Sequence, residues 1–272
     1  HTGEQVHMSC LPADVNTGIK FIRTDIEGRP EILASIMNVD STYRSTTIKK
    51  NDVYIHTIEH LLSALCGLDV DNVIVELSGP EIPILNGSAQ PFVKEILNVG
   101  LKEQEADREY IGFEQTIEFK DEVSGAEYIY MPPTDEELFE FTSIIEYNSK
   151  VGRQVASYKP DMSYADEIAP SRTFVFVNEL DELFQKGVIK GGRVDNAIVF
   201  SHKDYPEEKV RELATKFNVE PDVIVDNGIL NGLTLQFPNE PARHKLLDLL
   251  GDLYLLRKPL KGKIIAKKPG HT

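Results

Sequence analysis

Apolar and polar residues follow two different periods along this chain. In the stretch 72–77, β-branched residues combine with alternating polarity, which predicts a half-buried strand. In the stretches 57–66 and 241–256, apolar residues recur with helical spacing, and the later stretch is apolar on nearly every side. We therefore expect a helix in each of these two stretches, with the later helix buried.

The same patterns predict the other elements. Further strands are expected at 6–10, 20–24, 110–119, 126–131, 138–147, 197–200, 222–225 and 262–267, with 110–147 folded as an antiparallel meander. Further helices are expected at 91–97, 177–186 and 206–217, the second of them ending at Gly187. Strands and helices are mixed without a regular βαβ rhythm, so the expected class is α+β.

A charged stretch with few apolar residues, 101–109, separates two halves of the chain. We place a domain boundary there, which gives an N-terminal α+β domain at 1–107 and a C-terminal α+β domain at 108–272. The chain of 272 residues is long enough for two such domains, each with its own core.

Composition and charge exclude several classes of protein. No apolar run reaches the roughly 18 residues that a membrane-spanning helix needs, so we expect no transmembrane segment. A net charge of −15 argues against a nucleic-acid partner, which requires clustered lysine and arginine. The two cysteines, Cys10 and Cys66, form no CxxC pair, which excludes a zinc ribbon and is compatible with a reducing cytoplasm.

The densest chemical motif is His56-Thr57-Ile58-Glu59-His60. In one interpretation both histidines lie on one helical face and bind a metal beside Glu59, as in the inverted zinc-peptidase motif. In a second, only His60 is a ligand and Glu59 is the base. A surface histidine pair at a helix start is the third alternative, because short motifs often match by chance.

A second pair favours the interpretation with His60 alone. His244 and Asp248 are four residues apart in the expected buried helix, so they share one face. Imidazole and carboxylate suit zinc, and His60 would be the third ligand, leaving a fourth position for water as a catalytic site requires. The alternative is a surface His–Asp pair worth a few tenths of a kcal/mol.

A hydrolase also needs a base and an acid. Glu59 adjoins the ligand His60 and can act as the base without binding the metal. His271 is the candidate acid, and Asp252, one turn beyond Asp248, could hold it in its cationic form. On spacing alone, His271 is equally well a histidine of the chain's tail.

Together these motifs resemble those of the UDP-3-O-acyl-N-acetylglucosamine deacetylases, the zinc amidases of lipid A biosynthesis. The resemblance covers essentially the whole chain. Its blocks occur in the family's order at 1–3 with 16–19, 57–65, 80–93, 171–174, 191–197, 243–253 and 270–271. It implies two α+β domains, each a β-sheet layered with helices, with the helices packed between the two sheets and the site between the domains.

The resemblance also implies roles for individual residues. The implied roles are zinc binding by His60, His244 and Asp248, general base for Glu59, general acid for His271, support of His271 by Asp252, oxyanion stabilisation by Thr173, and substrate binding by Lys245, Phe174, Val194, Tyr147 and Lys268. The stretch 188–200 is expected to line a passage for the acyl chain. His56 is left off the ligand set because the family does not require histidine there.

The expected reaction is hydrolysis of the N-acetyl group of UDP-3-O-(3-hydroxyacyl)-N-acetylglucosamine in the cytoplasm, giving acetate and a free amine. The resemblance allows peripheral contact with the inner membrane, and a dehydratase domain fused after the end of this chain. Two rival hypotheses are an inverted zinc peptidase that uses His56 and His60, and a non-catalytic domain built around a closed four-ligand zinc site.

Overall fold

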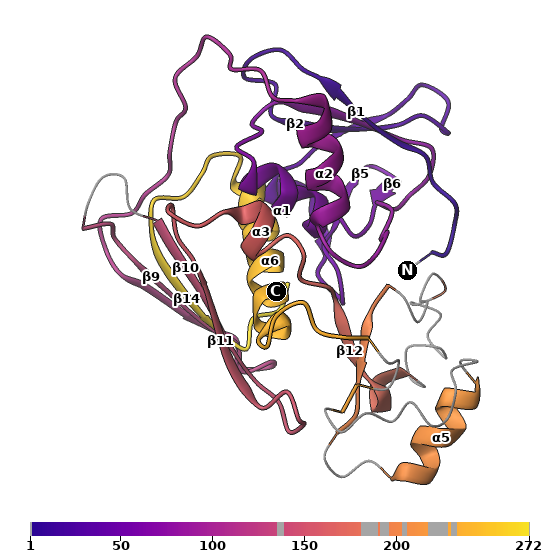
Figure 1. The fold of residues 1–272 in the computed structure, drawn as a ribbon. Coiled ribbons are helices and arrows are strands. Elements are labelled where there is room, and N and C mark those ends of the chain that lie inside the picture. Colours follow the sequence, from indigo (N-terminus) through magenta and orange to yellow (C-terminus); the bar gives the residue numbers. More distant parts are fainter. Residues whose placement is uncertain are drawn as a thin grey trace.

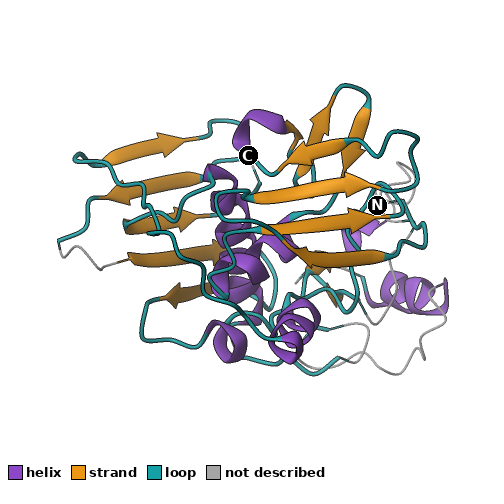
Figure 2. Cartoon of the chain, turned by 90° about the horizontal axis from the view of Figure 1, so that it is seen from above, coloured by secondary structure: helices purple, strands orange, loops and turns teal. Residues whose placement is uncertain are grey.

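Two β-sheets enclose the central helices of this protein. The computed structural model describes residues 2–134, 139–180, 190, 196–202, 206–216, 228–229 and 233–271. Figure 1 shows the helices α1 (Glu59–Gly67) and α6 (Glu240–Leu253) next to each other, with α6 on the side of the larger sheet. The view in Figure 2 shows helices between two groups of strands. The predicted α+β class, with helices between two sheets, is confirmed.

The first sheet comes from the N-terminal part of the chain. Its four strands have the order β1 (Met8–Pro12), β7 (Val73–Leu77), β2 (Ile19–Arg23) and β3 (Glu31–Leu33). β2 and β7 are parallel, and the outer pairs are antiparallel. In β7 fully buried residues alternate with partly buried ones, as the sequence pattern predicted for 72–77.

A small antiparallel sheet precedes α1. It contains β4 (Val39–Ser41), β5 (Thr47–Lys50) and β6 (Val53–Ile55), and the 3₁₀ helix η1 (Ile36–Asn38) leads into it. These strands and β3 were not predicted, because each is only three or four residues long and carries no clear alternation. The helix α2 (Gln90–Val99) follows β7, close to the expected 91–97.

The second sheet is built from strands that are far apart in sequence. Its order is β11 (Arg153–Tyr158), β10 (Phe139–Glu146), β14 (Gly262–Lys267), β9 (Glu127–Met131) and β8 (Ile117–Lys120). The predicted meander over 110–147 is therefore wrong, because β14 lies between β9 and β10 and runs parallel to β10. Alternate residues of β14 are buried, so it occupies the centre of the sheet, whereas β8 is exposed throughout and forms an edge.

Several further elements complete the described part of the chain. They are the short helix α3 (Tyr164–Glu167), the parallel pair β12 (Phe174–Phe176) and β13 (Ile198–Phe200), the helix α5 (Glu207–Lys216) and the 3₁₀ turn η2 (Tyr254–Leu256). Of the expected helix at 177–186, residues 177–180 are helical and the rest lies outside the described residues, as does the expected strand 222–225. The stretch 101–109 contains no helix or strand, and the domain boundary within it stays a prediction. No helix in the described ranges has the length and apolar character needed to span a bilayer.

α1 begins later than its apolar pattern indicates. Thr57 has a φ of 60°, in the left-handed region, so the helix cannot start there. Glu59 is the first helical residue, and residues Glu59 to Leu65 are all buried. α6 is buried on most of its faces because it packs against α1 on one side and against β10 and β11 on the other.

The backbones of α1 and α6 are in close contact at Gly251. A Cβ atom added at Gly251 would lie 2.1 Å from the carbonyl oxygen of Glu59, so only glycine fits at this crossing. Because Glu59 and His60 begin α1, the crossing brings that end of the helix against the α6 face that carries Asp248.

Gly251→Ala tests this contact. Alanine favours a helix over glycine by up to about 1 kcal/mol, but forcing a methyl group against a backbone oxygen typically costs about 1–3 kcal/mol. We expect a lower free energy of unfolding, measured by urea denaturation. Gly112→Ala is the control, because its added carbon would meet no atom closer than 3.8 Å. A Gly251→Ala protein as stable as the wild type would contradict the close crossing.

Candidate metal centre and active site

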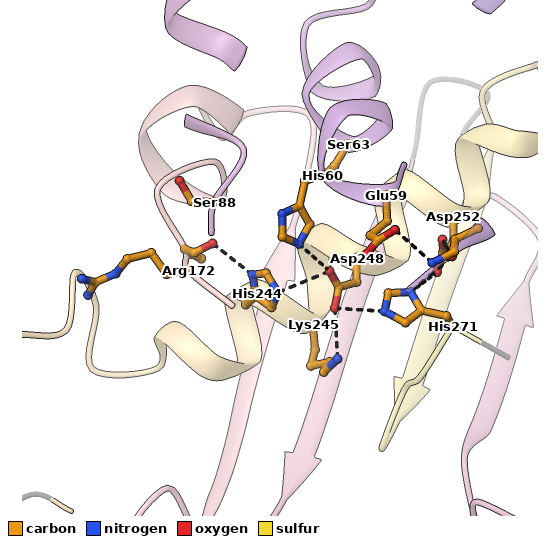
Figure 3. A network of polar contacts seen from close by, with 12 residues as sticks. Glu59, His60, Ser63, Ser88, Arg172, His244, Lys245, Asp248, Asp252 and His271 are labelled. Carbon is orange, nitrogen blue, oxygen red and sulfur yellow. Dashed lines mark hydrogen bonds and ion pairs between the residues drawn. The ribbon is translucent and has the colours of Figure 1, made fainter. Parts of the chain in front are cut away.

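Three buried side chains from α1 and α6 form a cluster. The ligand-type atoms of His60, His244 and Asp248 all lie within 4.8 Å of one another. Oδ1 of Asp248 is 3.6 Å from Nε2 of His60 and 3.4 Å from Nε2 of His244. The two imidazole rings lie edge to face, with centroids 5.0 Å apart. Figure 3 shows all three side chains converging on one point between the helices.

The polar atoms of this cluster fit a cation. Nδ1 of His244 is 3.0 Å from the carbonyl oxygen of Ser171, and a carbonyl only accepts, so Nδ1 carries the hydrogen and Nε2 presents its lone pair. That lone pair faces Asp248 Oδ1, which is buried and has no hydrogen-bond partner among the described residues. Two acceptors facing each other in a buried site repel unless a cation lies between them. The donor set of two imidazoles and one carboxylate therefore could hold a metal ion.

The charge states also suit a metal. Burial lowers the pKa of His244 to about 3, so its imidazole is neutral. Burial acts to raise the pKa of Asp248, but the charge of Lys245 and the other basic groups around the carboxylate outweigh it and hold that pKa well below its ordinary value. Neutral imidazole and ionised carboxylate are the forms that bind metals.

Lys245 lies between the cluster and two aromatic side chains, Phe174 and Tyr147, which together are called the aromatic wall. Its Nζ donates to Asp248 Oδ2 over 3.0 Å and lies 5.8 Å from the ring centroid of Phe174. Tyr147 packs edge to face on Phe174, with centroids 5.7 Å apart, and Phe174 lies 6.3 Å from the His244 ring. The structure thus brings together three of the five predicted substrate-binding residues beside His244.

Glu59 is the first residue of α1 and precedes His60. Its side chain is 3% exposed, and burial raises its pKa. Its Oε2 accepts a hydrogen bond from the backbone N–H of Thr46 over 3.0 Å. A carboxylate held in this way, with a raised pKa, has the properties of a general base.

His271 lies beside the cluster and is paired with Asp252. Nδ1 of His271 is 2.9 Å from Asp252 Oδ2, and its Nε2 is 4.0 Å from Asp248 Oδ2. Burial acts to lower the pKa of His271, but the charge and hydrogen bond of Asp252 outweigh it and raise that pKa to about 9. The preceding residue, Gly270, is bonded to the Tyr128 hydroxyl through both its N–H and its carbonyl, which fixes the end of the chain.

Thr173 belongs to a segment that runs past His244. Its N–H donates to the carbonyl of Gly87 over 2.7 Å, and its carbonyl accepts from Ile198 over 2.8 Å. Gly87 has a φ of 81°, and a Cβ there would lie 2.1 Å from the carbonyl oxygen of Asn196. The loop at Gly87 thus holds the backbone of Thr173 in place, and the predicted role of Thr173 at an oxyanion stays a prediction.

A buried ion pair holds the same segment on α6. Arg172 Nε donates to Oε1 of Glu240 over 2.8 Å, and its Nη2 bonds Oε2 of the same carboxylate and the carbonyl of Thr234. Glu240 is the first residue of α6 and is fully buried. The pair therefore ties Ser171, the acceptor of the His244 hydrogen bond, to the helix that carries His244.

Three other predicted residues lie away from the cluster or outside the described part. His56 lies in a β-bridge with Glu81 and bonds the Thr47 hydroxyl over 2.9 Å, so the helical His56–His60 pair of the inverted peptidase motif is wrong. Lys268 is exposed just after β14, and its N–H donates to the Ile144 carbonyl. Val194 lies outside the described residues, as does most of the expected passage at 188–200.

Thr46, Ser171 and Tyr128 also belong to the site but were not predicted from the sequence. Each acts through a contact with a residue distant in sequence: Thr46 with Asp252, Ser171 with His244, and Tyr128 with Gly270. No local spacing in the sequence distinguishes these residues, although Ser171 lies in the block 171–174, which is one of those that carry the family resemblance.

Comparisons with known proteins agree with the resemblance. A family model described as UDP-3-O-acyl N-acetylglycosamine deacetylase matches residues 1–213 and 209–272. The bifunctional enzyme LpxC/FabZ of Chlorobaculum tepidum is 44% identical over 276 residues, which covers 100% of this chain and 58% of that protein. The enzyme of the same name from Bacteroides thetaiotaomicron is 43% identical, over 100% of this chain and 59% of its own length. The UDP-3-O-acyl-N-acetylglucosamine deacetylase of Acidithiobacillus ferrooxidans is 38% identical over 100% of this chain and 81% of its own. The chain thus spans less than two thirds of the bifunctional relatives.

Asp252→Asn tests the pairing with His271. The substitution removes the charge that raises the pKa of His271, so in metal-free protein the imidazole should titrate well below its wild-type value of about 9, as followed by NMR. The raised pKa means that the pair stabilises the fold fully below the ordinary histidine pKa of about 6.5 and that this stabilisation is lost as pH rises through the folded value. The variant should therefore lose less stability over that pH window.

The exposed residue Asp107, in the stretch between the two sheets, provides the control Asp107→Asn, which should leave the His271 titration unchanged. An unaltered His271 titration in Asp252→Asn would show that Asp252 does not set the charge of this imidazole.

Proposed function

The chain belongs to the UDP-3-O-acyl N-acetylglycosamine deacetylase family, and on that premise we propose that it is a zinc-dependent amidase of lipid A biosynthesis. The proposed substrate is UDP-3-O-(3-hydroxyacyl)-N-acetylglucosamine, and the products are acetate and the free amine. The observation that supports this proposal most strongly is the buried cluster of His60, His244 and Asp248, in which Asp248 Oδ1 has no hydrogen-bond partner within the described ranges. We place the reaction in the cytoplasm.

His60, His244 and Asp248 would hold the zinc. When bound, zinc acts as a Lewis acid that polarises a carbonyl oxygen and makes water more acidic. The family's relatives support the deacetylase activity by their names, and the donor set supports the choice of zinc.

The chain's own residues would move the protons. Glu59 takes a proton from the attacking water, whose oxygen bonds to the carbonyl carbon of the acetamide. The carbon–nitrogen bond then breaks, and the departing nitrogen takes a proton from His271, which Asp252 keeps charged. Thr173 would help to hold the negative oxygen of the tetrahedral intermediate, a role that can be worth about 3 kcal/mol. The products are acetate and an amine.

The aromatic wall supports a place for the substrate. Lys245 would bind the polar head of the substrate, next to Phe174 and Tyr147. Phe174, together with Val194 and its neighbours in the stretch 188–200, would line the passage for the acyl chain. Tyr147 and Lys268 would contact the uridine. The fused dehydratase domain also stays a prediction, and two relatives named bifunctional agree with it.

The two rival hypotheses have less support. The inverted peptidase needs His56 as a ligand, and His56 is not among the three clustered side chains in the described part of the chain. A closed structural site needs four protein ligands, and the cluster found among the described residues supplies three.

Acetate release is the direct test of the activity. Purified, zinc-loaded protein should release acetate from the UDP-linked substrate, and Glu59→Gln should reduce kcat by about 10²–10⁴ while retaining the zinc, because only proton transfer is lost. Glu118→Gln, at an exposed edge strand, is a control that should keep full turnover. No acetate release by folded, zinc-loaded wild-type protein would refute the proposal.

Metal stoichiometry distinguishes the ligand sets. His244→Ala removes a proposed ligand and should lose most of the bound zinc, as measured by atomic absorption after gel filtration. His56→Ala should keep one zinc per chain. Retention of zinc by His244→Ala together with its loss by His56→Ala would instead support the inverted peptidase.

A further inference from the structure

Thr46 is a buried residue that contacts both halves of the proposed proton-transfer machinery. It lies immediately before β5, on the N-terminal side of α1, and is 1% exposed. Its carbonyl accepts the N–H of Ile58, the residue before α1, over 3.3 Å. This bond fixes the backbone of Thr46 against the start of the helix that carries Glu59.

One side of Thr46 holds Glu59. The backbone N–H of Thr46 donates to Glu59 Oε2 over 3.0 Å. The bond uses one oxygen of the carboxylate and restricts its rotation. A base must present its oxygen at a defined position, since a misplacement of about 1 Å can reduce a rate a hundredfold.

The other side of Thr46 holds Asp252. The Thr46 hydroxyl donates to Asp252 Oδ1 over 2.5 Å, and it lies 3.4 Å from His271 Nδ1. His271 Nδ1 itself is 2.9 Å from Asp252 Oδ2. The Asp252 carboxylate is therefore fixed between two donors, one at each oxygen, and it orients the imidazole with Nε2 toward Asp248.

We infer that Thr46 is a positioning residue that holds Glu59 and the Asp252–His271 pair in one frame. A single rigid residue sets the position of the proton acceptor through its amide and of the proton donor through its hydroxyl. The expected effect on rate rests on the proposed function, but the orientation of His271 can be measured without turnover.

Thr46→Val tests the inference, because valine keeps the branched shape and the backbone N–H but removes the hydroxyl. We expect kcat to fall about tenfold to a hundredfold. KM should stay within about twofold of the wild-type value and the zinc content should be unchanged, because the variant alters neither the proposed zinc ligands nor the aromatic wall. Thr46→Ser retains the hydroxyl and should recover most of the lost rate.

Thr47→Val is the matched control. Thr47 is the next residue and is also buried, but its hydroxyl bonds His56, which lies outside the metal cluster. This variant should keep the wild-type kcat. Equal kcat in Thr46→Val and Thr47→Val, or a Thr46→Ser protein as slow as Thr46→Val, would overturn the inference.

A second measurement does not depend on turnover. The ¹⁵N NMR signals of the His271 imidazole in zinc-loaded protein should shift in Thr46→Val and stay at the wild-type positions in Thr46→Ser and Thr47→Val. If the wild type released no acetate, the proposed function would fail and these signals alone would decide the inference. Unchanged His271 signals in Thr46→Val would overturn it.

Discussion

The candidate site depends on the close crossing of α1 and α6. Because Gly251 has no side chain, the carbonyl of Glu59 in α1 can lie against the backbone of α6. Any side chain at position 251 would collide with that carbonyl oxygen. The crossing brings His60 within 3.6 Å of Asp248, although the two residues lie in distant parts of the sequence. The packing of α1 against α6 therefore determines which side chains can bind one metal ion together.

Burial gives the cluster its chemical character. Charged groups away from water need partners, and here each has one: Asp248 bonds Lys245, Asp252 bonds both His271 and Thr46, and Arg172 bonds Glu240. The oxygen left over, Oδ1 of Asp248, faces two imidazole nitrogens. The same burial that makes unpaired charges costly thus leaves one position where a cation would lower the energy.

The sequence predicted the parts of this arrangement that depend on local spacing. The four-residue separation of His244 and Asp248 placed them on one face of α6, and the apolar surround of that helix predicted its burial. Spacing alone could not exclude His56, because the left-handed conformation of Thr57 that starts α1 late has no mark in the sequence. The central place of β14 and the contacts of Thr46 are long-range, and periodicity carries no information about them.

X-ray absorption spectroscopy of the zinc-loaded protein tests the central claim most directly, since it reports the atoms bound to the metal. The account predicts zinc bound by two imidazoles and a carboxylate, with the remaining coordination from water. The spectrum should be unchanged in His56→Ala. Sulfur in the zinc shell, a third imidazole, or four protein ligands would contradict the account.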